Sequence, residues 1–551
     1  MNAYIKNIHR FLAVAGCSAG ILTQQQAFAQ KEKDNLKEET IDIISNYRPK
    51  LRDAAKLNLT ASLPSFDTTR PALQYQVPAL NLYFMYQPIP LKPLALGKDS
   101  LSRLQNNFIK AGYGNLSTPL IQAGFGTGRQ EKYNLGVYVN YTSSKGDIKN
   151  QDYSTLNVLG SGTYFTPLWE ISGSIGYDRN QIHYYGYDHA TLEFSKNDVK
   201  QNFNQFTAQV GVKNRPLNDW AFRFEPSARF IYFSDAYKRK EPTVVFKVPV
   251  SKQLFEDIYI KAEGVFDLSS FKEDDHPQVN NNVVAIHPAL EIVKPRFMLH
   301  AGVNPTWTNS KFYLLPDIVN ESHIIYKKVI LSSGWTSYIN KNSFRNLANQ
   351  NPFLGSYGEG ILNTRVEEKY TGIKGTIGSH FNYNTKFAAV TWHNMPLFVN
   401  DSIDGKTFYT KNEEELRAFN LHAEVGYIQE EKFQLRLAFD WFNYNKQKSE
   451  IKPWGLIPFQ ADAFAQYTLA KKLHLNANLY YLGGTYYQVF ATQDFDKTKG
   501  KWDLSAGANY DIGKNFNIWV NANNLFNSKY QRWYGYQTYG LNVVGGVMIK
   551  F

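Results

Sequence analysis

Cysteine is almost absent from this sequence, and so are long apolar runs. The 551 residues include one cysteine, Cys17, close to the N-terminus. No later stretch offers the roughly 18 consecutive apolar residues that a membrane-spanning helix needs, which excludes a helical membrane protein. Val14–Cys17 loosely resembles a lipoprotein box, so lipidation at Cys17 is one alternative for the start of the chain.

The first 29 residues have the pattern of a cleaved signal peptide. A basic start is followed by a mostly apolar run over Phe11–Leu22, and Ala27-Phe28-Ala29 supplies the small-x-small cleavage pattern. We expect cleavage before Gln30. The exported chain would then contain no cysteine, which fits an oxidising compartment and excludes disulfides and thiolate metal sites.

Aromatic residues are abundant, and basic residues outnumber acidic ones. The aromatic share is 15%, and the formal charge is +12. Many Tyr and Phe residues suit a barrel with aromatic girdles at both membrane interfaces; a soluble β-rich carbohydrate-binding protein is the alternative on composition. Because export disfavours a nucleic acid partner, the positive charge indicates contacts with anionic outer-membrane lipid and lipopolysaccharide.

The composition changes near residue 105. Residues 30–104 begin with a charged run and continue with regularly spaced prolines, which favours an extended periplasmic segment over a packed domain. From about Asn107 to the last residue, short alternating segments are separated by turn signals. We therefore divide the chain into a signal peptide (1–29), an extended segment (30–104) and a barrel (105–551).

Apolar and polar residues alternate with a period of two, as strand side chains do. Three segments show this most clearly, and their apolar rows begin or end with an aromatic residue: Tyr133, Leu135, Val137, Val139 and Tyr141; Trp220, Phe222, Phe224, Ala228, Phe230 and Tyr232; and Leu473, Leu475, Ala477, Leu479 and Tyr481. Such rows predict a lipid-facing band, and their polar neighbours predict an enclosed interior.

One hairpin is predicted in detail. Residues 419–427 and 433–441 alternate around the polar turn 429–431. Folding the pair about Glu430 places Glu424 opposite Arg436 on the polar face, where opposite charges stabilise the pairing.

Connections between the predicted strands alternate in length towards the C-terminus. The links 395–416, 443–457, 483–500 and 527–538 are long, whereas 428–432, 470–472 and 511–515 are short. Tight periplasmic turns and larger external loops are typical of transmembrane barrels. We therefore predict an all-β fold: a large antiparallel transmembrane barrel of about 20–22 strands, closed because an open edge would leave backbone groups unpaired in lipid.

The C-terminal residues resemble a barrel-assembly signal. An alternating row ends in an aromatic residue and comprises Tyr539, Leu541, Val543, Val547, Ile549 and Phe551. Upstream, the run over residues 520–530 contains an Asn-Leu-Phe-x-x-x-Tyr pattern that resembles the penultimate strand and loop of TonB-dependent receptors. The run Asn351-Pro352-Phe353-Leu354, followed by 370–375, distantly resembles a mid-barrel motif of the same family.

This resemblance implies a barrel of 22 strands in the outer membrane of a Gram-negative bacterium, with the barrel-assembly machinery as a partner. The family's members carry a short N-terminal motif, the TonB box, that pairs with TonB. One run here resembles it: Glu39, Thr40, Ile41, Asp42, Ile43 and Ile44. An ordinary acidic-apolar stretch is the alternative. Residues 30–104 are too few for the family's plug domain and lack its Pro-Arg-Gly-type motifs, so the chain resembles a receptor without a full plug.

Candidate chemical groups are sparse. Gly124–Arg129 lacks the Lys-Ser/Thr of a phosphate loop and reads as a turn or a glycine-kinked strand. Two clusters could be considered for metals, but neither has a defined ligand spacing: His183, Asp188 and His189, and Asp274, Asp275 and His276. We expect no enzyme, metal or cofactor. The predicted function is transport by a receptor-like or channel-like barrel; the alternative is a structural or assembly partner that docks through its N-terminal segment.

Overall fold

The computed structural model describes residues 107–128, 130–215, 222–274, 276–355, 360–430, 432–489 and 494–551. The predicted signal peptide, the 30–104 segment and the TonB-box-like run Glu39–Ile44 lie outside these residues.

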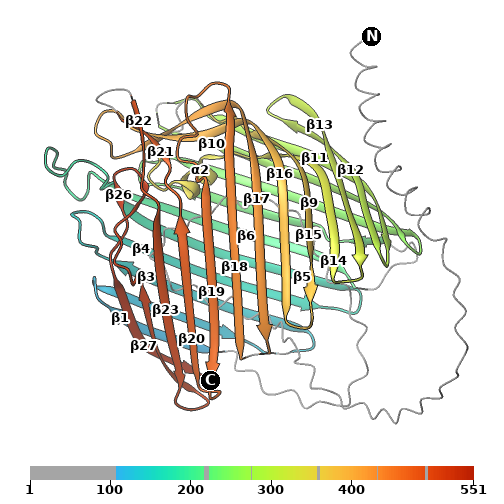
Figure 1. Ribbon diagram of the computed structural model, residues 1–551, viewed down its shortest axis with the longest axis horizontal. Helices are drawn as coiled ribbons and strands as arrows, with labels where there is room; N and C mark the ends of the chain where they lie inside the picture. The colour runs from blue at the N-terminus through green and yellow to red at the C-terminus, as the bar shows by residue number, and fades with distance from the viewer. Residues whose placement is uncertain are drawn as a thin grey trace, which may run out of the picture. The chain divides into compact units, whose positions relative to one another are not determined.

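The described chain is built almost entirely from β-strands (Figure 1). Within the described ranges, α2 (Phe344–Gln350) is the one α-helix, and no helix there is long and apolar enough to cross a membrane. Two small hairpins lie outside the main sheet: β21 (Tyr486–Val489) with β22 (Asp494–Lys497), and β25 (Gln531–Trp533) with β26 (Tyr536–Gln537).

The strands of the main sheet are β1 (Phe108–Gly114), β2 (Thr118–Gly126), β3 (Tyr133–Ser144), β4 (Tyr153–Phe165), β5 (Trp169–His183), β6 (Lys200–Asn214), β7 (Phe222–Phe224), β8 (Ser227–Ser234), β9 (Lys240–Phe255), β10 (Ile258–Phe271), β11 (Val279–Lys294), β12 (Phe297–Thr308), β13 (Lys311–Ile325), β14 (Val329–Asn340), β15 (Thr364–Ile377), β16 (Phe381–Asn400), β17 (Phe408–Gln429), β18 (Phe433–Gln447), β19 (Phe459–Leu469), β20 (Leu473–Leu482), β23 (Lys501–Asp511), β24 (Phe516–Asn523) and β27 (Asn542–Lys550).

These strands close into one antiparallel barrel. Apart from β7, each pairs with the next strand of the sheet along the chain, and β27 pairs with both β24 and β1, where Phe108 lies opposite Lys550. Both β7 and β8 pair with β9 and are separated by Glu225 and Pro226. Proline has no N–H to donate, so the two pieces form one interrupted strand. The described barrel therefore has 22 strands, which confirms the predicted fold class.

The predicted alternation is confirmed along the described strands; Trp220, at the start of one predicted row, lies outside the described residues. In β3, Leu135 and Val137 are about half exposed on the outside, whereas Tyr138 is buried on the inside. In β8, Phe230 and Tyr232 face outward, and Ile231 and Phe233 are buried. A closed sheet with an apolar exterior is the architecture of an outer-membrane barrel.

The register predicted for the β17–β18 hairpin is wrong by two residues. Glu424 lies opposite Ala438, and Arg436 lies opposite Gly426. Arg436 instead binds Asp462 on β19, with Nη2 2.6 Å from Oδ1. The polar face itself was predicted correctly, because His422 lies opposite Asp440 there and the two side chains are 2.9 Å apart.

Short and long connections lie at opposite ends of the barrel. We call the end with the tight turns, such as 470–472 and 512–515, the turn end; the loop end carries 448–458, 483–500 and 524–541. The long link predicted over 395–416 is wrong, because β16 continues to Asn400 and β17 begins at Phe408. These strands have 20 and 22 residues, about twice the length that spans a bilayer.

The barrel closes over a glycine-rich seam. Trp519 of β24 points inward and is 1% exposed, and the Nζ of Lys110 lies 4.1 Å from its ring centroid. A Cβ at Gly112 of β1 would overlap the Trp519 ring, and one at Gly546 of β27 would overlap the backbone of β1. An aromatic ring therefore covers strands that glycine allows to approach closely.

Candidate functional site

The inner wall of the barrel is hydrophilic. A ladder of side chains joins five consecutive strands, β2 to β6: Gln122 donates to Asn140 (3.1 Å), Asn140 to Asn157 (3.2 Å), and Asn157 to Asp178 (2.8 Å), which also accepts from Gln205 at 3.4 Å. On another part of the wall, Lys386 and Glu368 form a nearly buried ion pair of 2.7 Å. Such a wall favours polar solutes over apolar ones.

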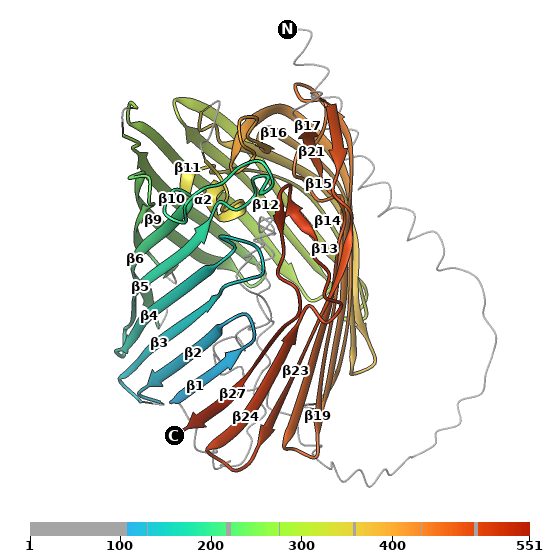
Figure 2. The same cartoon turned by 90° about the vertical axis from the view of Figure 1, so that its left-hand side faces the viewer.

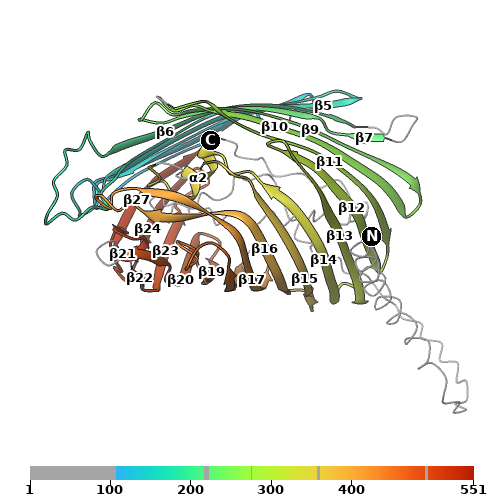
Figure 3. The same cartoon turned by 90° about the horizontal axis from the view of Figure 1, so that it is seen from above.

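At the loop end, residues 341–355 fold inward from β14. We call them the α2 segment, and Figures 2 and 3 show its helix inside the ring of strands. The Ser343 side chain caps the helix by accepting a hydrogen bond from the Asn346 N–H at 3.2 Å. Phe344 and Leu347 of this helix are fully buried. The segment therefore has a fixed conformation with its own packed face.

Arg239, in the turn before β9, anchors the far end of the α2 segment. Its guanidinium donates to Asp235 through Nε at 2.6 Å and to the Gly355 carbonyl oxygen through Nη1. The guanidinium also lies over the Phe344 ring, 4.5 Å from its centroid. The side chains of Arg239 and Asp235 are 2% and 0% exposed. A buried charge pair of this kind fixes geometry, because neither charge can return to water.

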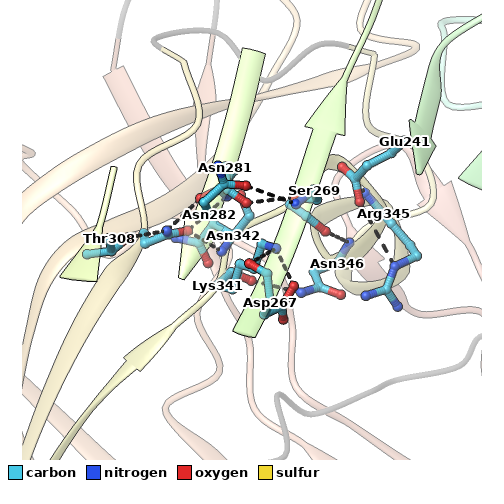
Figure 4. Close-up of polar contacts among 12 residues, drawn as sticks. Glu241, Asp267, Ser269, Asn281, Asn282, Thr308, Lys341, Asn342, Arg345 and Asn346 are labelled. Atoms are coloured by element: carbon cyan, nitrogen blue, oxygen red, sulfur yellow. Dashed lines mark hydrogen bonds and ion pairs between the residues drawn. The ribbon is translucent and has the colours of Figure 1, made fainter. Parts of the chain in front are cut away.

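Charged groups also hold the start of the α2 segment (Figure 4). The Glu241 carboxylate accepts from the Phe344 N–H at 2.7 Å, and its other oxygen lies 4.0 Å from the Arg345 Nε. Lys341 donates to the carboxylate and the carbonyl oxygen of Asp267 on β10. Burial lowers the pKa of Lys341, and Asp267 partly offsets this.

Buried asparagines connect both ends of the loop 341–363 to the wall. Asn363 and Asn281 of β11 exchange side-chain hydrogen bonds of 2.6 and 3.0 Å. Asn363 also donates to Thr308 of β12 at 2.7 Å and accepts from the Asn342 N–H at 3.0 Å. In Figure 4, Asn281, Thr308 and Asn342 lie beside Lys341, and Glu241 and Arg345 lie further away. Polar contacts therefore attach both ends of this loop to the wall.

The Asn363→Ala variant should loosen this attachment. It leaves buried polar groups of Asn281, Thr308 and Asn342 with fewer partners, and each unsatisfied group costs about 1–3 kcal/mol. We expect faster hydrogen exchange in residues 342–347 and a lower unfolding temperature. The exposed Gln278→Ala serves as the control. Equal exchange in both variants would show that the network contributes little.

Aromatic side chains from four loop-end regions meet against the α2 segment. Phe353 stacks on Tyr536 with ring centroids 3.4 Å apart, and Tyr185 meets the Tyr536 ring edge-on at 4.8 Å. Phe408 and Phe398 pack against Trp533 at 5.4 and 5.2 Å. Burial raises the pKa of Tyr184 and Tyr536 well above the usual tyrosine range. This aromatic cluster narrows the loop end of the lumen.

Five of the six residues of the predicted C-terminal row lie on the outer face of the barrel. Leu541, Val543, Val547, Ile549 and Phe551 are exposed on the outer face, as predicted. Tyr539 is not on that face: it is buried, and its hydroxyl donates to the Gln151 carbonyl oxygen. It lies three residues before β27 begins, outside the alternation that Leu541 still follows. The assembly role of this row stays a prediction.

The other motifs fall in several places. Gly124 and Gly126 lie in β2, consistent with a strand. His183 contacts the Asp152 carbonyl oxygen, whereas His189 contacts that of Tyr185, so they do not converge. No group of three metal-ligating residues exists among the described residues, which exclude Asp275.

The run Asn351–Leu354 is buried in the α2 segment. This run is the only sequence signal for the site, and no sequence pattern indicates Arg239 or Glu241.

Comparisons with known proteins identify the fold. No protein-family model and no curated protein matches the chain. Among solved structures, the FrpB iron transporter from Neisseria meningitidis (F3-3 variant) superposes with a TM-score of 0.65 at 12% identity, covering 82% of both chains. The siderophore receptor PirA from Acinetobacter baumannii gives 0.64 at 9%, covering 81% of this chain and 80% of that one. A mutant of the ferric enterobactin receptor PfeA from Pseudomonas aeruginosa gives 0.62 at 9%, with the same coverage. The chain therefore has the fold of these transporters and receptors.

Proposed function

We propose that this chain is a receptor-like transporter in the outer membrane of a Gram-negative bacterium. The observation that carries the proposal is a hydrophilic barrel whose loop end is narrowed by an anchored inner segment and aromatic loops. A general diffusion pore needs an open lumen, whereas a receptor needs loops that are organised around a solute. We assign the loop end to the cell exterior, because tight turns face the periplasm in such barrels.

The fold comparison supports transport rather than catalysis. The three similar structures are named as transporters or receptors of iron or of ferric siderophores. Ferric complexes are therefore the first solutes to test, although 9–12% identity carries no substrate over to this chain. The same proposal includes three further points. The chain is a member of the TonB-dependent receptor family, the barrel-assembly machinery recognises Tyr539–Phe551, and the barrel contacts lipopolysaccharide.

Deleting Glu39–Ile44 should abolish most solute uptake if TonB energises this transporter. An extended run can add a strand to a partner's sheet edge, and without it no force would reach the barrel. Uptake of radiolabelled ferric complexes by cells expressing the full chain measures the effect. Deletion of the neighbouring residues 31–36 is a control of equal length. Uptake that survives the first deletion would refute energised import, and uptake that never depends on the chain would refute the transport proposal.

A further inference from the structure

Basic side chains gather on the outer face of the barrel, on neighbouring parts of β15, β17 and β18. Arg365 and Lys369 of β15 share the outward face with Ile373, and Arg417 of β17 shares it with Phe419. Pairing through β16 brings these strands together: Glu367 and Arg417 both lie opposite Thr391. Lys446 of β18, which is exposed, pairs with Arg417.

Aromatic residues show where this level lies relative to the bilayer. Trp335 lies directly opposite Lys369, and Lys369 and Phe419 both pair with Ala389. Phe419 stacks on Phe387 with ring centroids 5.6 Å apart. From Arg417 the strand continues ten residues to Tyr427, near the turn end. At about 3.4 Å per residue and a tilt of about 40°, this is a height of about 25 Å, the usual thickness of the apolar band. Lys369 therefore lies within the girdle, and Arg365, Arg417 and Lys446 lie just beyond it, at headgroup level.

The local contacts fix these cations without covering them. Glu367 accepts from Lys369 at 2.8 Å and from the Trp335 indole N–H at 2.8 Å. Arg417 and Glu415 are 2.7 Å apart, and His393 lies 3.8 Å from the same carboxylate. The side chains of Lys369 and Arg417 are still 61% and 51% exposed. Four cations outnumber the two carboxylates, so the surface keeps an excess of positive charge.

The spacing suits a ligand with more than one phosphate. Arg417 is two strands from β15, or about 10 Å, and Arg365 and Lys369 are about 13 Å apart along their strand. We propose that Arg365, Lys369, Arg417 and Lys446 form a headgroup patch that binds the phosphates of a phosphorylated glycolipid in the outer leaflet. This inference rests on the proposed outer-membrane location and adds the site and the phosphate chemistry of that contact.

Binding of purified lipid A to the full chain in detergent tests this patch. Native mass spectrometry should show bound lipid A for the unmodified chain. The R365Q/K369Q/R417Q variant should bind it about a hundredfold more weakly, because each cation near an anionic surface contributes roughly fivefold. The control K432Q/K471Q/K514Q removes three exposed lysines from the turn end and should bind normally. R365K/R417K, which keeps the charges, should also bind.

Equal binding by the triple variant and its control would overturn the proposal, and so would equal binding of dephosphorylated lipid A. Heat-modifiable migration of each variant in gel electrophoresis verifies that the barrel has folded. Uptake measurements separate this site from the transport proposal, since the triple variant should still transport. Loss of lipid binding with normal uptake would support both, whereas normal lipid binding by a chain without uptake would contradict transport alone.

Discussion

Replacing Arg239 with alanine should release the α2 segment. The variant leaves the Asp235 carboxylate buried without its ion partner and removes the bond to the Gly355 carbonyl oxygen. Removing one member of a buried pair costs about 3–5 kcal/mol. Since ~1.4 kcal/mol is a factor of ten in an equilibrium constant, the segment should open at least a hundredfold more often. Hydrogen exchange of residues 344–354 measures this directly.

The same variant should also conduct ions better through the loop end. In planar bilayers we expect conductance steps that are larger or more frequent than those of the unmodified chain. Lys238→Gln is the matched control, because Lys238 lies in the same turn but its side chain is 77% exposed. Unchanged exchange and unchanged conductance in the Arg239 variant would show that the segment does not depend on this anchor.

Replacing Gly546 with valine should prevent the barrel from closing. A Cβ at this position would overlap the Ala111 carbonyl oxygen and the Gly112 Cα, and backbone atoms cannot move aside as a flexible side chain can. An unpaired edge in lipid costs several kcal/mol for each backbone group. We expect little or no folded, heat-modifiable protein in the outer membrane.

The adjacent Gly545 provides the control for this experiment. A Cβ there would have the Trp519 carbonyl oxygen as its nearest neighbour, at an ordinary distance of 3.5 Å. Gly545→Ala should therefore assemble normally, although it lies in the same strand. Equal amounts of folded protein from the two variants would mean that the seam tolerates a side chain and that its glycines are not required for closure.

Sequence patterns predict the features of this fold that depend on near neighbours. Which face Leu135 or Tyr138 occupies follows from the two-residue period alone, so the band and the polar interior were predictable. The pairing between strands is harder to predict, because moving a turn by one residue changes the cross-strand partner of every residue in the hairpin. Glu430 has a left-handed φ of 49° in the β17–β18 turn. The observed pairs are nevertheless two residues out of the predicted register, so Arg436 lies opposite Gly426 and binds Asp462 instead of Glu424.

The candidate site was largely invisible in the sequence for a related reason. Arg239 and the Gly355 carbonyl oxygen that it binds are 116 residues apart. In sequence, Asp235–Glu241 reads as a polar turn, since nothing local shows that its charges become buried. Only Asn351–Leu354 carries a sequence signal, through a family resemblance, and its inward position depends on strands that are distant in the chain.

The aromatic cluster at the loop end also sets an order of events during biogenesis. Tyr185 donates a 2.9 Å hydrogen bond to the Gln537 carbonyl oxygen, 352 residues further along the chain, and Phe353 stacks on Tyr536. The β25–β26 hairpin must therefore form before Tyr185 and Phe353 can reach their final contacts. Without the 524–541 loop in place, the aromatic cluster would lack Trp533 and Tyr536, and the loop end of the lumen would be wider than in the finished barrel.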